Sequence, residues 1–145
     1  NILLQFDNGA KGILHCSQIS IGEENSLTIK IYGEIGGLEW HQQEPNNLLV
    51  KWHNKPTEIY RTGFEYLCDD AKGATRLSAG HPEGFIEAFA TIYVNFAKAV
   101  RAFQLGDKNS IFDFPTIQDG VRGMQFIEKV VQSSKSDLKW IDFEN

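Results

Sequence analysis

The sequence predicts an α+β fold: an open, mostly antiparallel β-sheet with two long helices on one face. Two observations lead to this class. The first half of the chain consists of short runs in which apolar and polar residues alternate, and the second half changes to the apolar spacing of helices. A length of 145 residues with 41% hydrophobic composition is enough to bury a core. We therefore expect one domain, residues 1–145.

Strands are expected along the first half of the chain. Residues 2–6 and 12–20 flank Asn8 and Gly9, a dipeptide that favours a tight hairpin turn. Further strands are expected at residues 27–32, 38–40, 48–52 and 58–61.

The glycines Gly33, Gly36 and Gly37 are expected to form a hairpin turn. A dinucleotide-binding loop needs the pattern G-x-G-x-x-G between a strand and a helix, whereas here the spacing differs and a strand follows. We therefore predict no cofactor-binding residues in this chain.

A long helix is expected from Glu83 to Gly106, with Pro82 in its first turn. Its apolar face would consist of Phe85, Ile86, Phe89, Ile92, Tyr93, Phe96, Val100 and Phe103.

A second helix is expected after Pro115, because Thr116 and Asp119 have the spacing of a capping box. It would end at residues 133–136, and a last strand is expected at residues 138–141. The buried side of this helix would carry Val121, Met124, Ile127 and Val131.

Composition excludes several classes of protein. Fourteen basic and nineteen acidic residues give a formal charge of −5, which argues against a nucleic-acid partner. Interrupted apolar runs argue against a membrane span.

Cys16 and Cys68 form no C-x-x-C pair; the sequence leaves a disulfide between them open, but free thiols and a cytoplasmic location are favoured. The start inside a strand-like run, without a methionine, indicates a piece of a longer protein.

Several titratable groups are better explained as structural. His15, His41 and His53 lie in strand-like segments without the paired spacing of metal ligands, so no metal site is predicted. The acidic pair Asp69 and Asp70 is expected in a solvated turn rather than as a general acid and base.

His81 is the candidate substrate-binding residue. It directly precedes Pro82 at the start of the first long helix, where the helix dipole disfavours the protonated ring. A neutral imidazole there can form a hydrogen bond with a polar ligand. The alternative is a loop histidine that satisfies local backbone groups.

Two glycines in the second helix, Gly120 and Gly123, suggest that another element approaches that face closely. Asp119 and Arg122 nearby either contact a ligand or pair with neighbouring residues, and pairing is favoured.

With both helices on one face, the other sheet face would expose Leu, Ile, Val, Trp and Tyr side chains. Such a surface predicts association of two sheets in a symmetric dimer.

Four segments together resemble the C-terminal domain of the glucose–fructose oxidoreductase/inositol dehydrogenase (Gfo/Idh/MocA) family. They are IYGEIGGLEW (31–40), GHPEGFIEAFA (80–90), DFPTIQDGVRGM (113–124) and SSKS (133–136). The resemblance extends over residues 6–140, nearly the whole chain, and depends on the order and spacing of all four.

This resemblance implies a dihydrodipicolinate-reductase-like C-terminal domain of an NAD(P)-dependent oxidoreductase that acts on a sugar, an inositol or a related polyol. It implies that an N-terminal Rossmann domain, absent from this chain, holds NAD or NADP and the catalytic lysine. The present chain would cover the substrate and form a homodimer or tetramer through its sheet, and would be inactive alone. The resemblance assigns no catalytic residue to this chain and places His81 toward the substrate. The alternatives are a stand-alone carbohydrate-binding module and a pure assembly domain.

Overall fold

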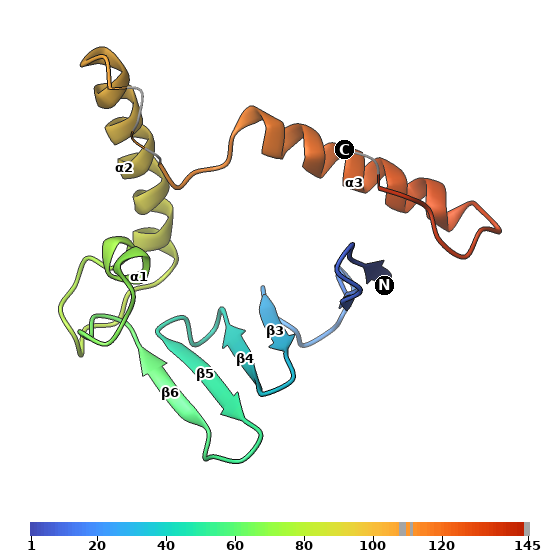
Figure 1. The fold of residues 1–145 in the computed structure, drawn as a ribbon, viewed down its shortest axis with the longest axis horizontal. Coiled ribbons are helices and arrows are strands. Elements are labelled where there is room, and N and C mark those ends of the chain that lie inside the picture. Colours follow the sequence, from blue (N-terminus) through green and yellow to red (C-terminus); the bar gives the residue numbers. More distant parts are fainter. Residues whose placement is uncertain (108–109, 111, 144–145) are drawn as a thin grey trace. The chain divides into compact units, whose positions relative to one another are not determined.

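The computed structural model describes residues 1–107, 110 and 112–143. Within them lie two antiparallel sheets and helices, which confirms the predicted α+β class (Figure 1). The elements are β1 (Ile2–Gln5), β2 (Lys11–Leu14), β3 (Thr28–Tyr32), β4 (Gly36–His41), β5 (Asn47–Trp52), β6 (Glu58–Arg61), α1 (Asp69–Ala74), α2 (Phe85–Gln104) and α3 (Ile117–Ser134).

The chain divides into two compact units. One combines Asn1–Ile21 with Phe114–Asn145, and the other is Gly22–Asp113. The first holds the β1–β2 hairpin and α3, and the second holds the sheet β3-β4-β5-β6 together with α1 and α2.

In the first unit, β1 and β2 form the expected hairpin. Ile2 pairs with Leu14, and the Gly9 N–H donates to the Phe6 carbonyl oxygen at 2.8 Å across the turn. The expected second strand is too long, because β2 ends at Leu14 and residues 15–20 are not in a strand.

The C-terminal tail corrects a second expectation. Residues 138–141 form no strand. The tail instead contacts α3: the Phe143 ring packs edge-on against Phe126 at 6.3 Å, and the Arg122 guanidinium lies 5.7 Å from the Phe143 ring centroid. A strand needs a neighbouring strand for its backbone groups, whereas this tail makes aromatic contacts with a helix.

The second unit contains a four-stranded meander. All its strand pairs are antiparallel, with Lys30 opposite Glu39 and Leu38 opposite Val50. The loop before Gly36 is a hairpin turn, as expected: the Gly33 N–H donates to the Gly36 carbonyl oxygen at 2.8 Å. A Cβ atom on Gly36 would lie 2.5 Å from the Lys51 carbonyl oxygen, so close approach of β5 requires glycine there.

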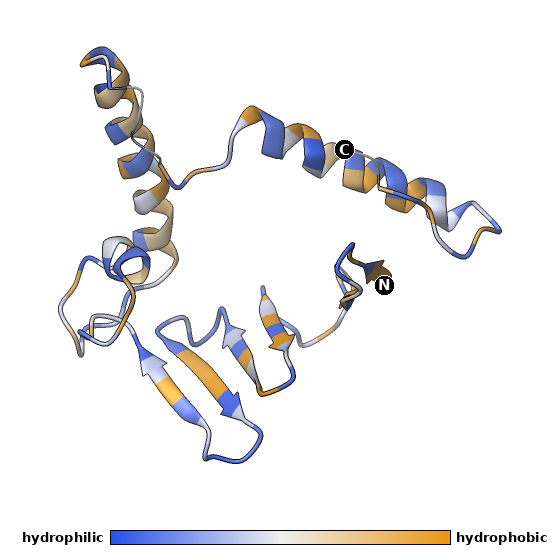
Figure 2. Cartoon of the chain, viewed as in Figure 1, coloured by the Kyte–Doolittle hydropathy of each residue, from blue (hydrophilic) through white to orange (hydrophobic). Residues whose placement is uncertain are grey.

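The register separates a charged face of the sheet from an apolar one. Lys30, Glu39 and Lys51 share one face, and Ile31 lies opposite Leu38 on the other. Figure 2 shows the hydrophobic stretch that β5 contributes. Strand alternation thus gives the sheet one apolar face, and the association of two copies through an uncovered apolar face stays a prediction.

The two long helices agree closely with the predicted ranges. α2 ends at Gln104, two residues before Gly106, and α3 starts after Thr116 as predicted. Phe89 of α2 and Met124 of α3 are 49% and 59% exposed, so the packing of both helices on one sheet face stays a prediction. Among the described residues, no helix is sufficiently long and apolar to cross a membrane.

Candidate functional site

His81 lies in the loop between α1 and α2, and its side chain is exposed. Helix α2 is capped by Gly84, so Pro82 precedes the first turn instead of lying in it. His81 is therefore three residues ahead of the helix cap, and its expected position beside the helix N-terminus stays a prediction.

The imidazole is held through one of its two nitrogens. Nδ1 of His81 lies 3.2 Å from both Oγ and the carbonyl oxygen of Ser78. A carbonyl oxygen only accepts, so donation from Nδ1 satisfies both contacts. In the neutral ring Nε2 is then an acceptor, and within the described part of the chain it has no hydrogen-bond partner. The ring can accept a hydrogen bond from a ligand hydroxyl.

The carboxylate of Glu83 closes the loop that carries His81. Its Oε1 accepts hydrogen bonds from the backbone N–H groups of Arg76 and Leu77, each at 2.6 Å. Residues 76 and 83 are thus tied together, and His81 lies near the end of the closed segment. Charge-assisted bonds to backbone N–H groups are among the stronger hydrogen bonds in proteins.

Asn46, which immediately precedes β5, attaches this loop to the sheet. Its Nδ2 donates to the Glu83 carbonyl oxygen at 2.8 Å, and its Oδ1 accepts from the Glu83 N–H at 2.9 Å. The same Oδ1 accepts from the Thr62 hydroxyl at 3.1 Å, just after β6. Asn46 and Glu83 are both half-buried, so these bonds are partly shielded from water.

The start of α2 continues the network. The Gly84 N–H donates to Oε2 of Glu87 at 2.8 Å, and this bond holds the pKa of the Glu87 carboxyl below its usual value. Arg76 donates from Nη2 to Oγ1 of Thr91 at 3.2 Å. The loop is therefore tied to the helix that follows it as well as to the sheet.

A cavity of about 150 Å³ adjoins this network. Asn46 and Thr62 line it, and the remainder of its wall is mainly apolar, with Trp40, Leu48 and Tyr60 from three strands. An apolar wall with few polar groups fits packing between the sheet and α1 better than a polyol site.

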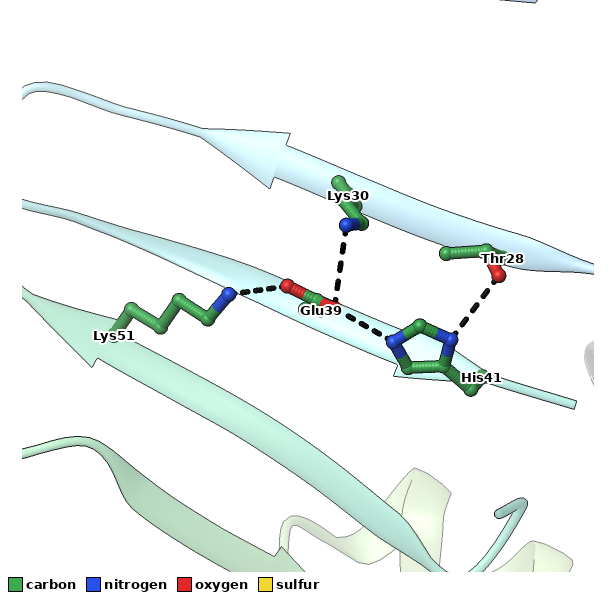
Figure 3. Close-up of polar contacts among 5 residues, drawn as sticks. All are labelled: Thr28, Lys30, Glu39, His41 and Lys51. Carbon is green, nitrogen blue, oxygen red and sulfur yellow. Dashed lines mark hydrogen bonds and ion pairs between the residues drawn. The ribbon is translucent and has the colours of Figure 1, made fainter. Parts of the chain in front are cut away.

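A second cluster of charges lies on the sheet (Figure 3). Glu39 is 8% exposed, and its carboxylate contacts Lys51, Nζ of Lys30 at 3.3 Å and Nε2 of His41 at 2.6 Å. The bonds from Lys51 and His41 lower the Glu39 pKa from 4.5 to about 2. Nδ1 of His41 lies 3.1 Å from the Thr28 hydroxyl. Because both imidazole nitrogens are engaged, this histidine is structural.

The other candidate histidines are separate from this cluster. Only His41 lies in a strand; His15 follows β2, with its Nδ1 2.6 Å from Oδ1 of Asn1, and His53 follows β5. No group of three potential His, Cys, Asp or Glu ligands is found in the described residues. Cys16 and Cys68 are free and exposed.

The polar residues at the start of α3 are structural. Asp119 accepts from the Thr116 backbone N–H at 2.7 Å, the capping box that the sequence predicts, and Arg122 pairs with Phe143. A Cβ atom on Gly120 or Gly123 would meet nothing within 4 Å, so the expected close approach is not seen.

Comparison with known proteins now identifies the domain. The family model "Oxidoreductase family, C-terminal alpha/beta domain" of the Gfo/Idh/MocA group matches residues 1–143. The chain belongs to this oxidoreductase family.

Relatives of known structure support the same assignment. An inositol dehydrogenase homolog from Azotobacter vinelandii, complexed with NADH and myo-inositol, is 32% identical over 97% of this chain and 38% of its own, with a TM-score of 0.90. An oxidoreductase from Sinorhizobium meliloti is 40% identical over 92% of this chain and 37% of its own, with a TM-score of 0.82.

One curated relative is similar at the sequence level. The uncharacterized oxidoreductase YfiI of Bacillus subtilis (strain 168) is 32% identical over 99% of this chain. The chain spans 37% of the length of that protein.

The sequence alone does not predict the residues whose hydrogen bonds hold the His81 loop. Asn46 and Glu83 are 37 positions apart, and no motif links an asparagine in one turn to a backbone segment so distant. The one available signal was the GHPEG segment, in which a glutamate follows the histidine by two residues.

Proposed function

We propose that this chain is the C-terminal domain of an NAD(P)-dependent oxidoreductase that acts on the CH–OH group of a sugar, an inositol or a related polyol. The family membership supports the reaction class, and the Azotobacter vinelandii homolog, complexed with NADH and myo-inositol, supports the substrate class. The reaction is hydride transfer between a secondary alcohol carbon and nicotinamide.

In this proposal the cofactor belongs to an N-terminal Rossmann domain. The glycine-rich segment Gly33–Gly37 of this chain is a hairpin turn that precedes a strand, so it does not provide a helix N-terminus for a pyrophosphate. We assign NAD or NADP and the catalytic lysine to that Rossmann domain. We also propose that the enzyme is cytoplasmic. The residues of this chain bind and orient the substrate.

The substrate role depends on the exposed side chain of His81, whose Nδ1 is bonded to Ser78. The ring is held at Nδ1 by Ser78, so Nε2 has a set direction and accepts a hydrogen bond from a substrate hydroxyl. A polyol offers several hydroxyl donors, and each one that enters a site needs an acceptor.

The test is steady-state kinetics of the full-length enzyme with His81→Ala. Loss of one hydrogen bond to the substrate is expected to raise KM for the polyol about 10-fold, with kcat changed far less. His15→Ala is the matched control, since His15 is also exposed and, among the residues that the structure describes, its ring bonds to Asn1. Unchanged kinetics in the His81 variant would support an assembly domain without substrate contact.

We also propose that the sheet forms a homodimer or tetramer contact. Strand alternation gives the sheet one apolar face, on which Ile31 lies opposite Leu38, and an uncovered apolar face favours association of two copies. Sedimentation of the full-length protein at high concentration tests this, and a strictly monomeric result contradicts it.

A further inference from the structure

The loop that carries His81 is held by several hydrogen bonds. The Glu83 carboxylate binds the N–H groups of Arg76 and Leu77, which closes residues 76–83 into a ring. Asn46 then binds both backbone polar groups of Glu83. Glu83, two residues after His81, therefore closes the ring and fixes it to the sheet through Asn46.

A backbone contact supports the loop from a second direction. Gly63, which follows β6, has a φ of +80°, and a Cβ atom on it would lie 2.8 Å from the Ala79 nitrogen and 2.9 Å from its Cα. Ala79 lies directly between Ser78, which holds the imidazole, and Gly80. The backbone that follows β6 thus approaches the loop closely beside Ser78, which binds the imidazole.

We infer that Glu83 and Asn46 are positioning residues that keep the His81 imidazole in its substrate-binding orientation, an inference that rests on the proposed function. Neither side chain needs to touch the substrate. Their effect passes through the loop backbone to Ser78 and from there to Nδ1 of His81. A site held by such a supporting shell loses affinity when the support is removed, although the binding residue itself is intact.

The test compares substitutions at Glu83 in the full-length enzyme. Glu83→Ala removes the acceptor of both N–H groups and is expected to raise KM for the polyol about 10-fold, with a much smaller change in kcat. Glu83→Gln keeps a carbonyl oxygen that can accept both bonds and is expected to restore KM to within about 2-fold of wild type. Glu65→Ala, an exposed carboxylate paired with Lys72, is the control and leaves KM unchanged.

A double variant distinguishes positioning from a separate contribution to folding or binding. If Glu83 acts through His81, the variant His81→Ala/Glu83→Ala has the KM of His81→Ala alone, because the group being positioned is already gone. If the KM increases of the two single variants multiply in the double variant, the inference is overturned.

Asn46→Asp provides a second route should Glu83→Ala fail to fold. The aspartate keeps the acceptor for the Glu83 N–H but places an oxygen against the Glu83 carbonyl, so KM is expected to rise as in Glu83→Ala. If His81→Ala raises KM while Glu83→Ala and Asn46→Asp do not, the positioning role is wrong and the proposed function stands. If His81→Ala itself has no effect, both the positioning role and the substrate-binding role of His81 are wrong.

Discussion

Oε1 of Glu39 lies 2.6 Å from Nε2 of His41, two residues along the same strand. Since the Glu39 carboxylate is ionised at neutral pH, it only accepts, and His41 donates to it. With Lys30 and Lys51 on the neighbouring strands, one nearly buried carboxylate joins β3, β4 and β5 through side chains (Figure 3). The cluster therefore links three strands through side chains in addition to their backbone hydrogen bonds.

The first prediction concerns acid stability. The Glu39 pKa falls from 4.5 to about 2 in the folded chain, so the folded state binds fewer protons than the unfolded state between these values. The stabilisation is present above pH 4.5 and is lost as the pH falls toward 2. We expect the wild type to lose melting temperature over this interval more steeply than Glu39→Gln, as measured by circular dichroism. Parallel curves of melting temperature against pH for the two proteins would contradict this role of Glu39.

The second prediction compares two ion pairs at neutral pH. Glu39→Gln leaves Lys30 and Lys51 without their counter-charge on the sheet and should lower the melting temperature. Glu65→Gln removes the partner of Lys72 where the glutamate is fully exposed, and should change the free energy of unfolding by less than about 1 kcal/mol. An equal effect of both substitutions would show that the sheet cluster is no stronger than a surface pair.

The third prediction concerns the cap of α3. The Thr116 hydroxyl accepts from the Asp119 N–H and donates to the Asp119 carboxylate, so Thr116→Ala should destabilise the protein by about 1 kcal/mol. Thr116→Ser keeps the hydroxyl and should recover most of the loss. Chemical denaturation measures both. A Thr116→Ala variant as stable as wild type would contradict the capping role.

Local sequence signals predicted the parts of this fold that local physics determines. The capping box of Thr116 and the hairpin turn at Asn8 and Gly9 were both confirmed, because each depends on residues within four positions of each other. The sequence does not predict the short helix α1. Asp69 and Asp70, which were expected in a solvated turn, lie in the first turn of this helix. The helix dipole stabilises carboxylates at that position. Six residues are too few for a helical period to be seen.

Interactions distant in sequence were not predictable in the same way. The charged sheet face depends on the pairing of Lys30 with Glu39, and the His81 loop depends on Asn46. Alternation alone places residues on two faces, but it does not show which partners lie opposite them. The candidate site was therefore predicted at His81, whereas its supporting residues required the tertiary structure.

The fourth prediction concerns the backbone contact below the His81 loop. Gly63→Ala combines a positive φ with a Cβ atom 2.8 Å from the Ala79 nitrogen, so it should destabilise the protein by more than about 1 kcal/mol. Gly73→Ala, in the helix α1, meets nothing within 4 Å and should be neutral or stabilising. Thermal unfolding of the two variants measures this difference. Equal stability of the two would contradict the contact between Gly63 and Ala79.

The fifth prediction tests the glycines of α3. A Cβ atom on Gly123 meets nothing within 4 Å in the described structure, and alanine is favoured over glycine in a helix interior by about 1 kcal/mol. Gly123→Ala should therefore raise the free energy of unfolding by up to about 1 kcal/mol, measured by chemical denaturation of the full-length protein. A loss of stability would show that another element approaches this side of α3 in the whole enzyme, because only a close neighbour makes an added methyl group unfavourable.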